Sequence, residues 1–265
     1  MEKIGIIVGN GKLPLYFLKE SINENIELYP VGLFSSIEPE IKAHKNYKEF
    51  NIGNVGEITK YFLKNNILKV IMLGKVEKKL IFENLELDEI GTKLLKKLPD
   101  RKDETLLFGT IVFFKLNGIK ILPQNYLLKT LMVEKKCYTT STPTPEEKET
   151  IKIGLEAGIA LGKLDIGQSI ICKDSSIVAI EGIEGTDATI LRGGLLSGRD
   201  TILIKMGRAQ QDMRVDIPTV GINTIKKLVE IGARGIVMDS KKMLFLDQKE
   251  CIELADKNKI FMIGR

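Results

Sequence analysis

IGIIVGNGKLP, residues 4–14, opens the chain with a β-branched run, a glycine-rich turn and the start of a helix. The apolar run Ile4–Val8 predicts a buried strand, and the amphipathic stretch Leu15–Asn23 predicts a helix. A strand, a tight turn and a helix in this order form the first half of a βαβ unit. The amides of such a turn can point at a phosphate or a nucleotide.

The alternation of strand and helix continues through the first 75 residues and beyond. Further elements are predicted in this order: a strand at Glu27–Val31, a helix at Val55–Asn65, a strand at Val70–Leu73, mostly helix over Ile81–Leu116 and a strand at Ile119–Leu122. This rhythm is typical of a parallel sheet with helices on both faces, whose ligands meet the carboxyl ends of the strands. We therefore predict an N-terminal α/β domain over residues 1–134.

The composition changes over residues 135–146, where KKCYTTSTPTPE holds two prolines and five Thr or Ser residues. Such a stretch interrupts helix and strand alike, so we predict a linker over 135–145. Thr144 is a good N-cap, and Pro145 fits the first turn of a helix that runs through Lys163.

A second α/β domain is predicted over residues 146–265. Its strands are expected at Ser169–Cys172, Ser176–Ile180, Thr201–Lys205, Gly235–Val237, Met243–Leu246 and Ile260–Ile263. Its later helices are expected near Asp187–Leu195, Ile222–Ile231 and Gln248–Asn258. No fixed-period repeat is visible, which argues against a solenoid. The predicted fold class is α/β in both domains.

Charge and hydropathy exclude two kinds of partner. The formal net charge of +5 comes from scattered lysines among nearly as many acids, without the dense basic stripe of a nucleic-acid-binding protein, so we predict no nucleic-acid partner. The longest apolar stretch, Leu106–Phe114, is too short to span a bilayer. The N-terminus has no basic segment followed by a long apolar one, so we expect no signal peptide. A lipid, if one is involved, is a ligand.

The single histidine, His44, lies in the polar stretch Lys42–Lys48, where a solvated loop residue is expected. Ser-His-Asp triads, Cys-His dyads, zinc hydrolases and histidine-rich phosphoesterases need at least one well-placed imidazole, so these mechanisms are excluded. Cys137, Cys172 and Cys251 stand far apart without a CxxC pair, which argues against a zinc site and against a secreted disulfide framework. A reducing cytosol fits best.

The turn over residues 9–14, GNGKLP, matches neither of two common nucleotide-binding motifs. Pro14 stands where a dinucleotide fingerprint has its third glycine, and no acidic residue ends the second predicted strand. No Ser or Thr follows Lys12, as a Walker A loop requires. A phosphate-binding turn and a tight turn that binds nothing are the two alternatives.

Residues 181–192, EGIEGTDATILR, place acids, a hydroxyl and an arginine at a strand-to-helix junction. The junction gathers Glu181, Glu184, Thr186, Asp187 and Arg192. Carboxylates and a hydroxyl at a helix N-terminus, with an arginine one or two turns on, can hold Mg²⁺ and a phosphate together. The alternative is that Thr186 or Asp187 only caps the helix.

RVDIPT, residues 214–219, is predicted to put Arg214 and Asp216 on one face of an extended segment that Pro218 terminates. The alternative is an internal ion pair on a strand. LDIGQ, residues 164–168, ends a helix with a glycine two residues past an aspartate, as in a simple helix exit.

These segments together resemble one enzyme family. The residues that carry the match are IGIIVGNGKLP at 4–14, GKV at 74–76, Asp103 with Leu106 and Leu107, LDIGQ at 164–168, EGTDA at 184–188 with Arg192, and RVDIPTVG at 214–221. In this order they resemble the LpxI-type UDP-2,3-diacylglucosamine pyrophosphatases of lipid A biosynthesis, over nearly the whole chain. EGTDA followed at this distance by RVDIPT is the specific part, and GNGKLP is less so.

The resemblance implies a Rossmann-like N-terminal domain, a C-terminal catalytic domain of a family-specific fold, and a substrate held between them. It also implies dependence on Mg²⁺ and the products UMP and 2,3-diacylglucosamine 1-phosphate. Asn10 and Lys75 stand where the family usually has a small neutral residue, so their side chains are a departure from its pattern.

Our hypothesis for the chemistry is that Asp216, with Asp187 or Glu184, holds Mg²⁺ against the pyrophosphate and aligns a water for attack on phosphorus. Asp216 could instead deprotonate that water. Thr186, Arg192 and Arg214 are predicted to steady the phosphate oxygens. Residues predicted to bind the substrate are Gly9, Asn10, Gly11, Lys12, Lys75, Asp165, Gln168, Gly185 and Thr219.

Two other function classes remain open at this stage. A two-domain protein could bind a nucleotide-sugar or lipid without hydrolysing it, or it could be a nucleotide-sugar transferase that needs an acceptor. As a pyrophosphatase, the protein is expected in the cytoplasm, with an acylated UDP-sugar as substrate. Transient contact with the inner leaflet of the membrane and a homodimer are further expectations.

Overall fold

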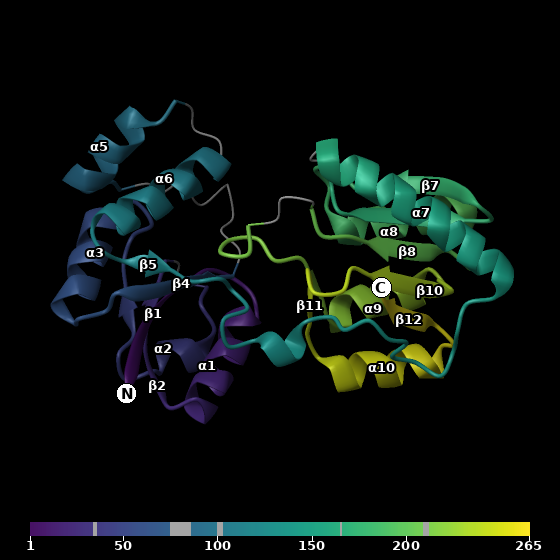
Figure 1. The fold of residues 1–265 in the computed structure, drawn as a ribbon, viewed down its shortest axis with the longest axis horizontal. Coiled ribbons are helices and arrows are strands. Elements are labelled where there is room, and N and C mark those ends of the chain that lie inside the picture. The colour runs from purple at the N-terminus through teal and green to yellow at the C-terminus, as the bar shows by residue number, and fades with distance from the viewer. Residues whose placement is uncertain (34–35, 75–85, 100–102, 165, 209–211) are drawn as a thin grey trace. The chain divides into compact units, whose positions relative to one another are not determined.

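The computed structural model of the chain describes residues 1–265 apart from 34–35, 75–85, 100–102, 165 and 209–211. The described residues form two compact units. The first unit is Met1–Leu128 together with Met213–Val215, and the second is Lys129–Asp212 with Asp216–Arg265. Each unit is built around its own sheet (Figure 1).

The first unit contains a five-stranded sheet in the order β3-β2-β1-β4-β5. The strands are β1 (Glu2–Val8), β2 (Ile26–Gly32), β3 (Lys48–Glu49), β4 (Lys69–Leu73) and β5 (Lys120–Ile121). All neighbouring strands in it are parallel. The predicted parallel sheet is thus confirmed, and its order is that of the Rossmann fold. Because the order reverses at β1, the carboxyl ends of β1 and β4 form the edge where such sheets bind ligands.

Helices cover both faces of this sheet (Figure 1). They are α1 (Leu13–Asn23), α2 (Pro39–Lys42), α3 (Val55–Lys64), α5 (Glu89–Lys97) and α6 (Asp103–Leu116). Phe62 of α3 and Phe114 of α6 are buried in one core cluster, with ring centroids 6.3 Å apart. A Cβ atom on Gly5 would lie 2.6 Å from the Phe62 ring, so the glycine in β1 lets α3 pack closely.

The second unit has a mixed five-stranded sheet in the order β12-β10-β8-β6-β7. Its strands are β6 (Ser169–Lys173), β7 (Ser176–Ile180), β8 (Ile202–Lys205), β10 (Gly235–Met238) and β12 (Phe261–Gly264). β8, β10 and β12 run parallel, whereas β6 is antiparallel to both of its neighbours. β9 (Thr219–Val220) and β11 (Leu244–Phe245) form a small parallel pair beside it.

The helices of the second unit are α7 (Pro145–Leu164), α8 (Thr186–Ser197), α9 (Ile222–Glu230) and α10 (Gln248–Lys257). Thr144 begins α7 as predicted, because its Oγ1 accepts a hydrogen bond of 3.2 Å from Glu147 N. Glu147 Oε2 in turn accepts one of 2.7 Å from Thr144 N. This reciprocal capping box satisfies amides that the first turn leaves unpaired.

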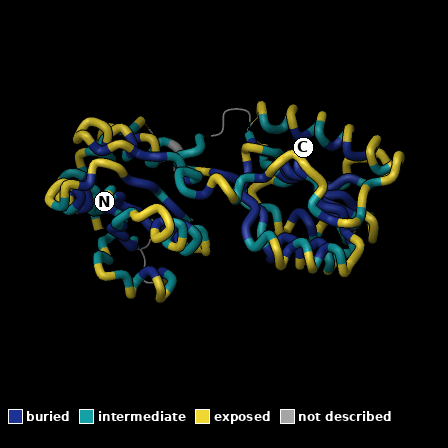
Figure 2. The backbone as a smooth tube through the Cα atoms, turned by 60° about the horizontal axis from the view of Figure 1, so that its bottom comes forward, coloured by how far each residue is buried: buried dark blue, intermediate teal, exposed yellow. Residues whose placement is uncertain are grey.

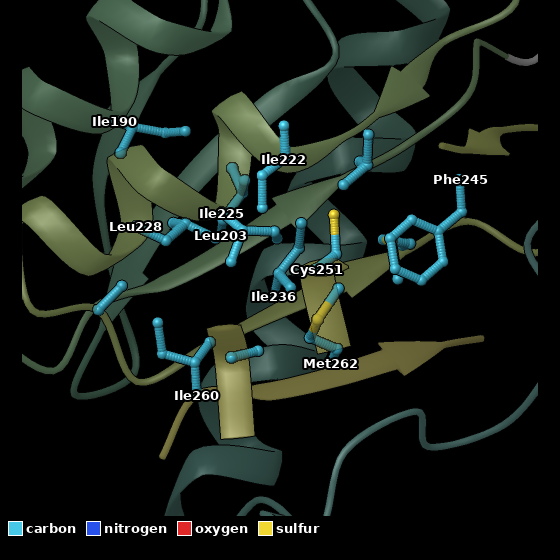
Figure 3. Close-up of a cluster of buried hydrophobic side chains, with 14 of the residues drawn as sticks. Ile190, Leu203, Ile222, Ile225, Leu228, Ile236, Phe245, Cys251, Ile260 and Met262 are labelled. Atoms are coloured by element: carbon cyan, nitrogen blue, oxygen red, sulfur yellow. The ribbon is translucent and has the colours of Figure 1, made fainter. Parts of the chain in front are cut away.

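Apolar side chains from the strands, α8, α9 and α10 form the main core of the second unit (Figure 3). Its residues include Ile190, Leu203, Ile225, Ile236 and Met262, each at most 1% exposed. The buried strands lie inside a shell of exposed helix faces in both units (Figure 2). Burial of this apolar surface is the main stabilising term of each unit.

Residues 135–145, where a linker is predicted, lie in the second unit. Tyr138 N donates a hydrogen bond of 2.8 Å to Met262 O, and Met262 N donates one of 2.8 Å to Thr139 Oγ1. The stretch therefore runs along β12 and adds hydrogen bonds to the outer edge of the sheet.

Candidate active site

The loop between β7 and α8 is held by Glu184. Its Oε1 accepts hydrogen bonds from Arg192 Nη2 at 2.6 Å and from Thr189 Oγ1 at 3.2 Å, and its Oε2 accepts one from Gly182 N at 3.0 Å. Gly185 enters α8 at φ +82°, a conformation that favours glycine. Its own amide and the Arg192 guanidinium hold the pKa of the Glu184 carboxyl below its usual range. Glu184 and Arg192 are thus brought together, as an ion pair.

A second network lies at the first residue of α8. Thr186 Oγ1 donates to Glu181 Oε1 at 3.1 Å and accepts from Lys205 Nζ at 3.0 Å. Ser169 Oγ lies 3.1 Å from the same oxygen. A threonine hydroxyl has one proton and two lone pairs. Because Thr186 uses its proton in the hydrogen bond to Glu181, the Ser169 hydroxyl must be the donor in its hydrogen bond to Thr186. Thr186 therefore has a partner for each of its hydrogen-bonding positions.

Lys205 is a site residue that the sequence analysis missed. It ends β8 and is only 7% exposed, and a lysine is rarely buried this far without partners. A lysine that continues the apolar run Ile202–Ile204 was the available signal, because a charge inside a buried strand needs a specific partner. Thr186, at the end of the β7–α8 loop, is one such partner of Lys205.

Gln168 lies beside the same network. Its backbone amide donates a hydrogen bond of 3.3 Å to Glu181 Oε2, and its carbonyl accepts one of 2.8 Å from Met206 N. Asp187 occupies the first turn of α8 and is exposed. Asp165 and Lys75, which are also predicted to contact the substrate, lie outside the described residues.

The Arg214–Asp216 segment differs from its prediction. Residues 213–215 form a turn, and Asp216 N donates a hydrogen bond of 3.2 Å to Asp212 O, so the predicted extended segment is wrong. Pro218 precedes a strand rather than terminating one, because its carbonyl accepts from Leu244 N at 2.9 Å while its ring nitrogen has no proton to donate. Thr219 then begins β9.

Arg214 belongs to the first unit through the short segment Met213–Val215. Gln124 N donates a hydrogen bond of 2.7 Å to Met213 O, and Gln124 Nε2 donates one of 2.8 Å to Met72 O in β4. Val215 packs against the core cluster of the first unit. Gln124, which the sequence analysis did not single out, thereby anchors Arg214 near the carboxyl end of β4.

The glycine-rich turn after β1 lies at the same edge of the sheet. Gly9 N donates a hydrogen bond of 2.8 Å to Leu73 O, and Gly11 adopts φ +105° before α1 begins. A Cβ atom on Gly74, at φ +90°, would lie 2.6 Å from Gly9 O. The turns after β1 and β4 thus touch through backbone atoms. Asn10 also accepts a hydrogen bond of 2.7 Å from Ser36 Oγ.

The structure does not assemble the three predicted magnesium ligands into one cluster. Within the described part of the chain, no group of three or more His, Cys, Asp or Glu side chains is arranged to hold a metal ion. Glu184 is also engaged with Arg192 and Thr189. Asp187 and Asp216 are exposed carboxylates, and Mg²⁺ commonly uses only one or two carboxylates together with substrate phosphates. The carboxylate oxygens of all three residues are donors that fit the ion, and those of Glu184 already accept hydrogen bonds from Gly182, Thr189 and Arg192.

His44 lies in a bend after α2 and is half-buried. Its Nδ1 accepts a hydrogen bond of 3.2 Å from Asn46 N. Partial burial, and then the charge of Lys45, lower the pKa of the imidazole. The predicted loop position is confirmed, with less solvent access than predicted.

The fold, the turn after β1 and the β7–α8 loop define a class of protein: a two-domain α/β protein whose N-terminal domain has the Rossmann strand order. The LpxI N-terminal domain matches residues 3–131, and the LpxI C-terminal domain matches residues 134–263. The chain therefore belongs to the LpxI family.

One curated relative is the UDP-2,3-diacylglucosamine pyrophosphatase LpxI of Caulobacter vibrioides. It is 27% identical over an alignment 275 positions long, which covers 100% of this chain and 98% of the relative. Among solved structures, an N-terminal ketoreductase from a macrolactin assembly line aligns at 8% identity with a TM-score of 0.27. That alignment covers 100% of this chain and 54% of the ketoreductase chain, and its similarity is too low to bear on the fold.

Proposed function

We propose that this protein hydrolyses the pyrophosphate of UDP-2,3-diacylglucosamine to UMP and 2,3-diacylglucosamine 1-phosphate, as a step of lipid A biosynthesis. The observation that carries the proposal is the match of both family domains, in order, to nearly the whole chain. The full-length relative that bears this activity in its name supports it. The alignment covers 100% of this chain and 98% of that relative.

The turn at residues 9–12 is the proposed contact for the nucleotide or the sugar phosphate. It lies at the carboxyl end of β1, where the strand order of the sheet reverses. Arg214, anchored near the carboxyl end of β4 in the same unit, is proposed to pair with phosphate oxygens there. An arginine and backbone amides together would suit a charged phosphoanhydride.

The C-terminal unit is proposed to supply the reacting groups. Asp216 acts on the attacking water, either as its base or through a bound ion, and Arg192 and Thr186 are proposed to steady phosphate oxygens. In the present conformation Thr186 is engaged with Lys205 and Glu181, and Arg192 with Glu184. Contact of Thr186 with phosphate therefore requires an exchange of its partners, whereas Arg192 donates to Ile180 O and Glu184 Oε1 from Nη2 alone. Gly185, Gln168, Asp165 and Thr219 remain proposed substrate contacts.

We propose Mg²⁺ as the cofactor, with Asp187 and Asp216 as the carboxylates that take part and Glu184 as a ligand only after release from Arg192. The ion would neutralise charge on the pyrophosphate. Complete removal of divalent ions with EDTA should stop turnover, and added Mg²⁺ should restore it. Full activity after careful chelation would contradict this part of the proposal.

The decisive experiment is incubation of the pure protein with UDP-2,3-diacylglucosamine and Mg²⁺, followed by separation of the nucleotides. Release of UMP in a one-to-one ratio with the acyl-sugar phosphate is the expected result. A stable complex with intact substrate would indicate a binding protein. Product that forms only after an acceptor is added would indicate a transferase.

We also propose a cytoplasmic location with peripheral contact at the inner leaflet of the membrane. Among the described residues, no helix is long and apolar enough to cross a membrane. The proposed substrate carries two acyl chains and would therefore reside in the membrane. A homodimer remains a prediction, which a mass measurement in solution would test.

A further inference from the structure

Helix α6 is apolar on two opposite faces. On the inner face, Ile111 and Phe114 are at most 5% exposed and belong to the core of the first unit. On the outer face, Phe108, Val112 and Leu116 are 61%, 38% and 81% exposed. The three outer residues are spaced by four, so they form one continuous line along the helix, which we name the α6 stripe. A surface helix normally presents polar residues on that side.

Lysines flank the α6 stripe. Lys115 precedes Leu116 in the last turn of α6, and Lys96 and Lys97 lie in the last turn of α5. A Cβ atom on Gly109 would lie 2.7 Å from Leu98 Cδ2, so the end of α5 rests against the middle of α6. All three lysines are exposed, and none forms an ion pair with another described residue.

This combination points to a particular partner. We infer that the α6 stripe is a membrane-docking surface, which inserts shallowly at the boundary between headgroups and acyl chains of an anionic bilayer while Lys96, Lys97 and Lys115 contact lipid phosphates. Aromatic and aliphatic side chains on one line with lysines beside them are the composition of interfacial helices. Each lysine near an anionic surface adds attraction that salt weakens.

A second copy of the chain fits this surface less well. Stable protein interfaces bury about 800 Å² on each partner, more than the three stripe side chains can supply. The centre of such interfaces is also depleted of lysine. Lipid phosphates, in contrast, are a suitable counter-charge for exposed lysines that flank an apolar line.

The inference rests on the proposed function in one respect: an enzyme whose substrate is a membrane lipid must reach the bilayer. Binding to vesicles that contain no substrate needs no turnover, so the docking surface and the proposed activity can fail independently of each other.

The test is flotation of the full-length protein with vesicles of phosphatidylethanolamine and phosphatidylglycerol, compared with vesicles of phosphatidylcholine alone. The wild type should bind the anionic vesicles, and high salt should weaken binding. Joint substitution Phe108→Ser, Val112→Ser and Leu116→Ser should lower vesicle affinity by about tenfold or more. Ile22→Ser is the matched control, because Ile22 is a 74% exposed aliphatic residue on α1 of the same unit.

The variants should fold as the wild type does, since the side chains removed are exposed; Phe108→Ala with Leu116→Ala is the milder pair if the triple variant does not fold. Unchanged vesicle binding by a folded variant would overturn the inference. Two further outcomes would also overturn it. A dimeric wild type that the substitutions convert to monomers would make the stripe a subunit interface. Loss of turnover on detergent-dispersed substrate would make it part of an acyl-chain site.

Discussion

Lys205 Nζ donates a hydrogen bond of 3.0 Å to Thr186 Oγ1, which joins the end of β8 to the start of α8. The lysine is buried, and the Thr186 hydroxyl donates a hydrogen bond to Glu181. A cation and a carboxylate are thus linked through one threonine oxygen. This arrangement fixes the rotamer of Thr186 and the entry of α8, because a satisfied polar network within a partly buried site resists rearrangement.

We expect Lys205→Met to lower the free energy of unfolding by on the order of 1–3 kcal/mol, because Thr186 loses a charged donor in a partly buried network. The measurement is the urea midpoint of the purified variant. Lys226→Met, on the exposed face of α9, is the control and should leave the midpoint within error. Equal midpoints for the two variants would show that the buried network contributes nothing to stability.

Asp216→Asn should keep the fold and lose activity. Asp216 is exposed, so its replacement by an isosteric amide should barely change the melting temperature. If Asp216 acts on the attacking water, the rate of UMP release should fall by about 10²-fold or more. Residual activity near the wild-type rate would remove Asp216 from the mechanism, whatever its effect on metal binding.

The ion pair between Glu184 and Arg192 predicts a pH dependence of stability. The backbone amide of Glu184 and the Arg192 guanidinium hold the pKa of the Glu184 carboxyl below its usual range, so the ionised carboxylate stabilises the fold at higher pH. This contribution should be lost as the pH falls through the lowered pKa. In the wild type, the free energy of unfolding should therefore fall as the pH drops below about 4.5, and in Glu184→Gln it should fall less over the same range. Urea titration of both proteins at several pH values measures this difference. The same decline in both proteins would contradict the lowered pKa.

Gly74→Ala should distort the turn that follows β4. Its φ of +90° disfavours any residue with a Cβ, and the added atom would also lie 2.6 Å from Gly9 O. Gly118→Ala is a matched control, because Gly118 has φ +78° but nothing within 4 Å of an added Cβ. Strain alone costs about 1–3 kcal/mol, so Gly74→Ala should cost clearly more than Gly118→Ala. Equal losses in the free energy of unfolding for the two variants would mean that the close contact between Gly74 and Gly9 does not contribute to stability.

The cysteines should differ sharply in reactivity. Burial raises the pKa of Cys172 to about 11 and, with nearby acids, that of Cys251 to about 12, whereas Cys137 is exposed. Because the thiolate is the reactive form, a thiol-disulfide reagent should modify only Cys137 in the native protein. Titration of released chromophore should show the other two thiols only after denaturation. Cys137→Ser should abolish the native reaction, and any fast reaction that remains would contradict the burial of the other two.

Local sequence patterns were sufficient for most of the secondary structure. The apolar runs Ile4–Val8 and Ser176–Ile180 became strands as predicted, and the amphipathic stretch Val55–Asn65 became a helix. The reason is that the period of apolar residues within one element records which side of it faces the core. β9 escaped prediction, because a two-residue strand is too short for any period to show.

The family resemblance likewise rested on residues close together in the sequence, such as EGTDA and RVDIPT. Sequence alone thus determined the class of fold in both units, the cap at Thr144 and the family. It also singled out the acids and the arginine of the β7–α8 loop. It did not say which of them would be free to meet a ligand.

Only the tertiary structure decided which distant residues meet. Met213–Val215 belongs to the first unit because Gln124 and a core cluster hold it there, and Lys205 reaches Thr186 because β8 pairs with β6. The antiparallel direction of β6 could not be predicted from the apolar pattern either, since the pattern of buried residues in a strand is the same in either direction. Strand order and direction arise from contacts between elements, whereas the sequence pattern records only the burial of each element by itself.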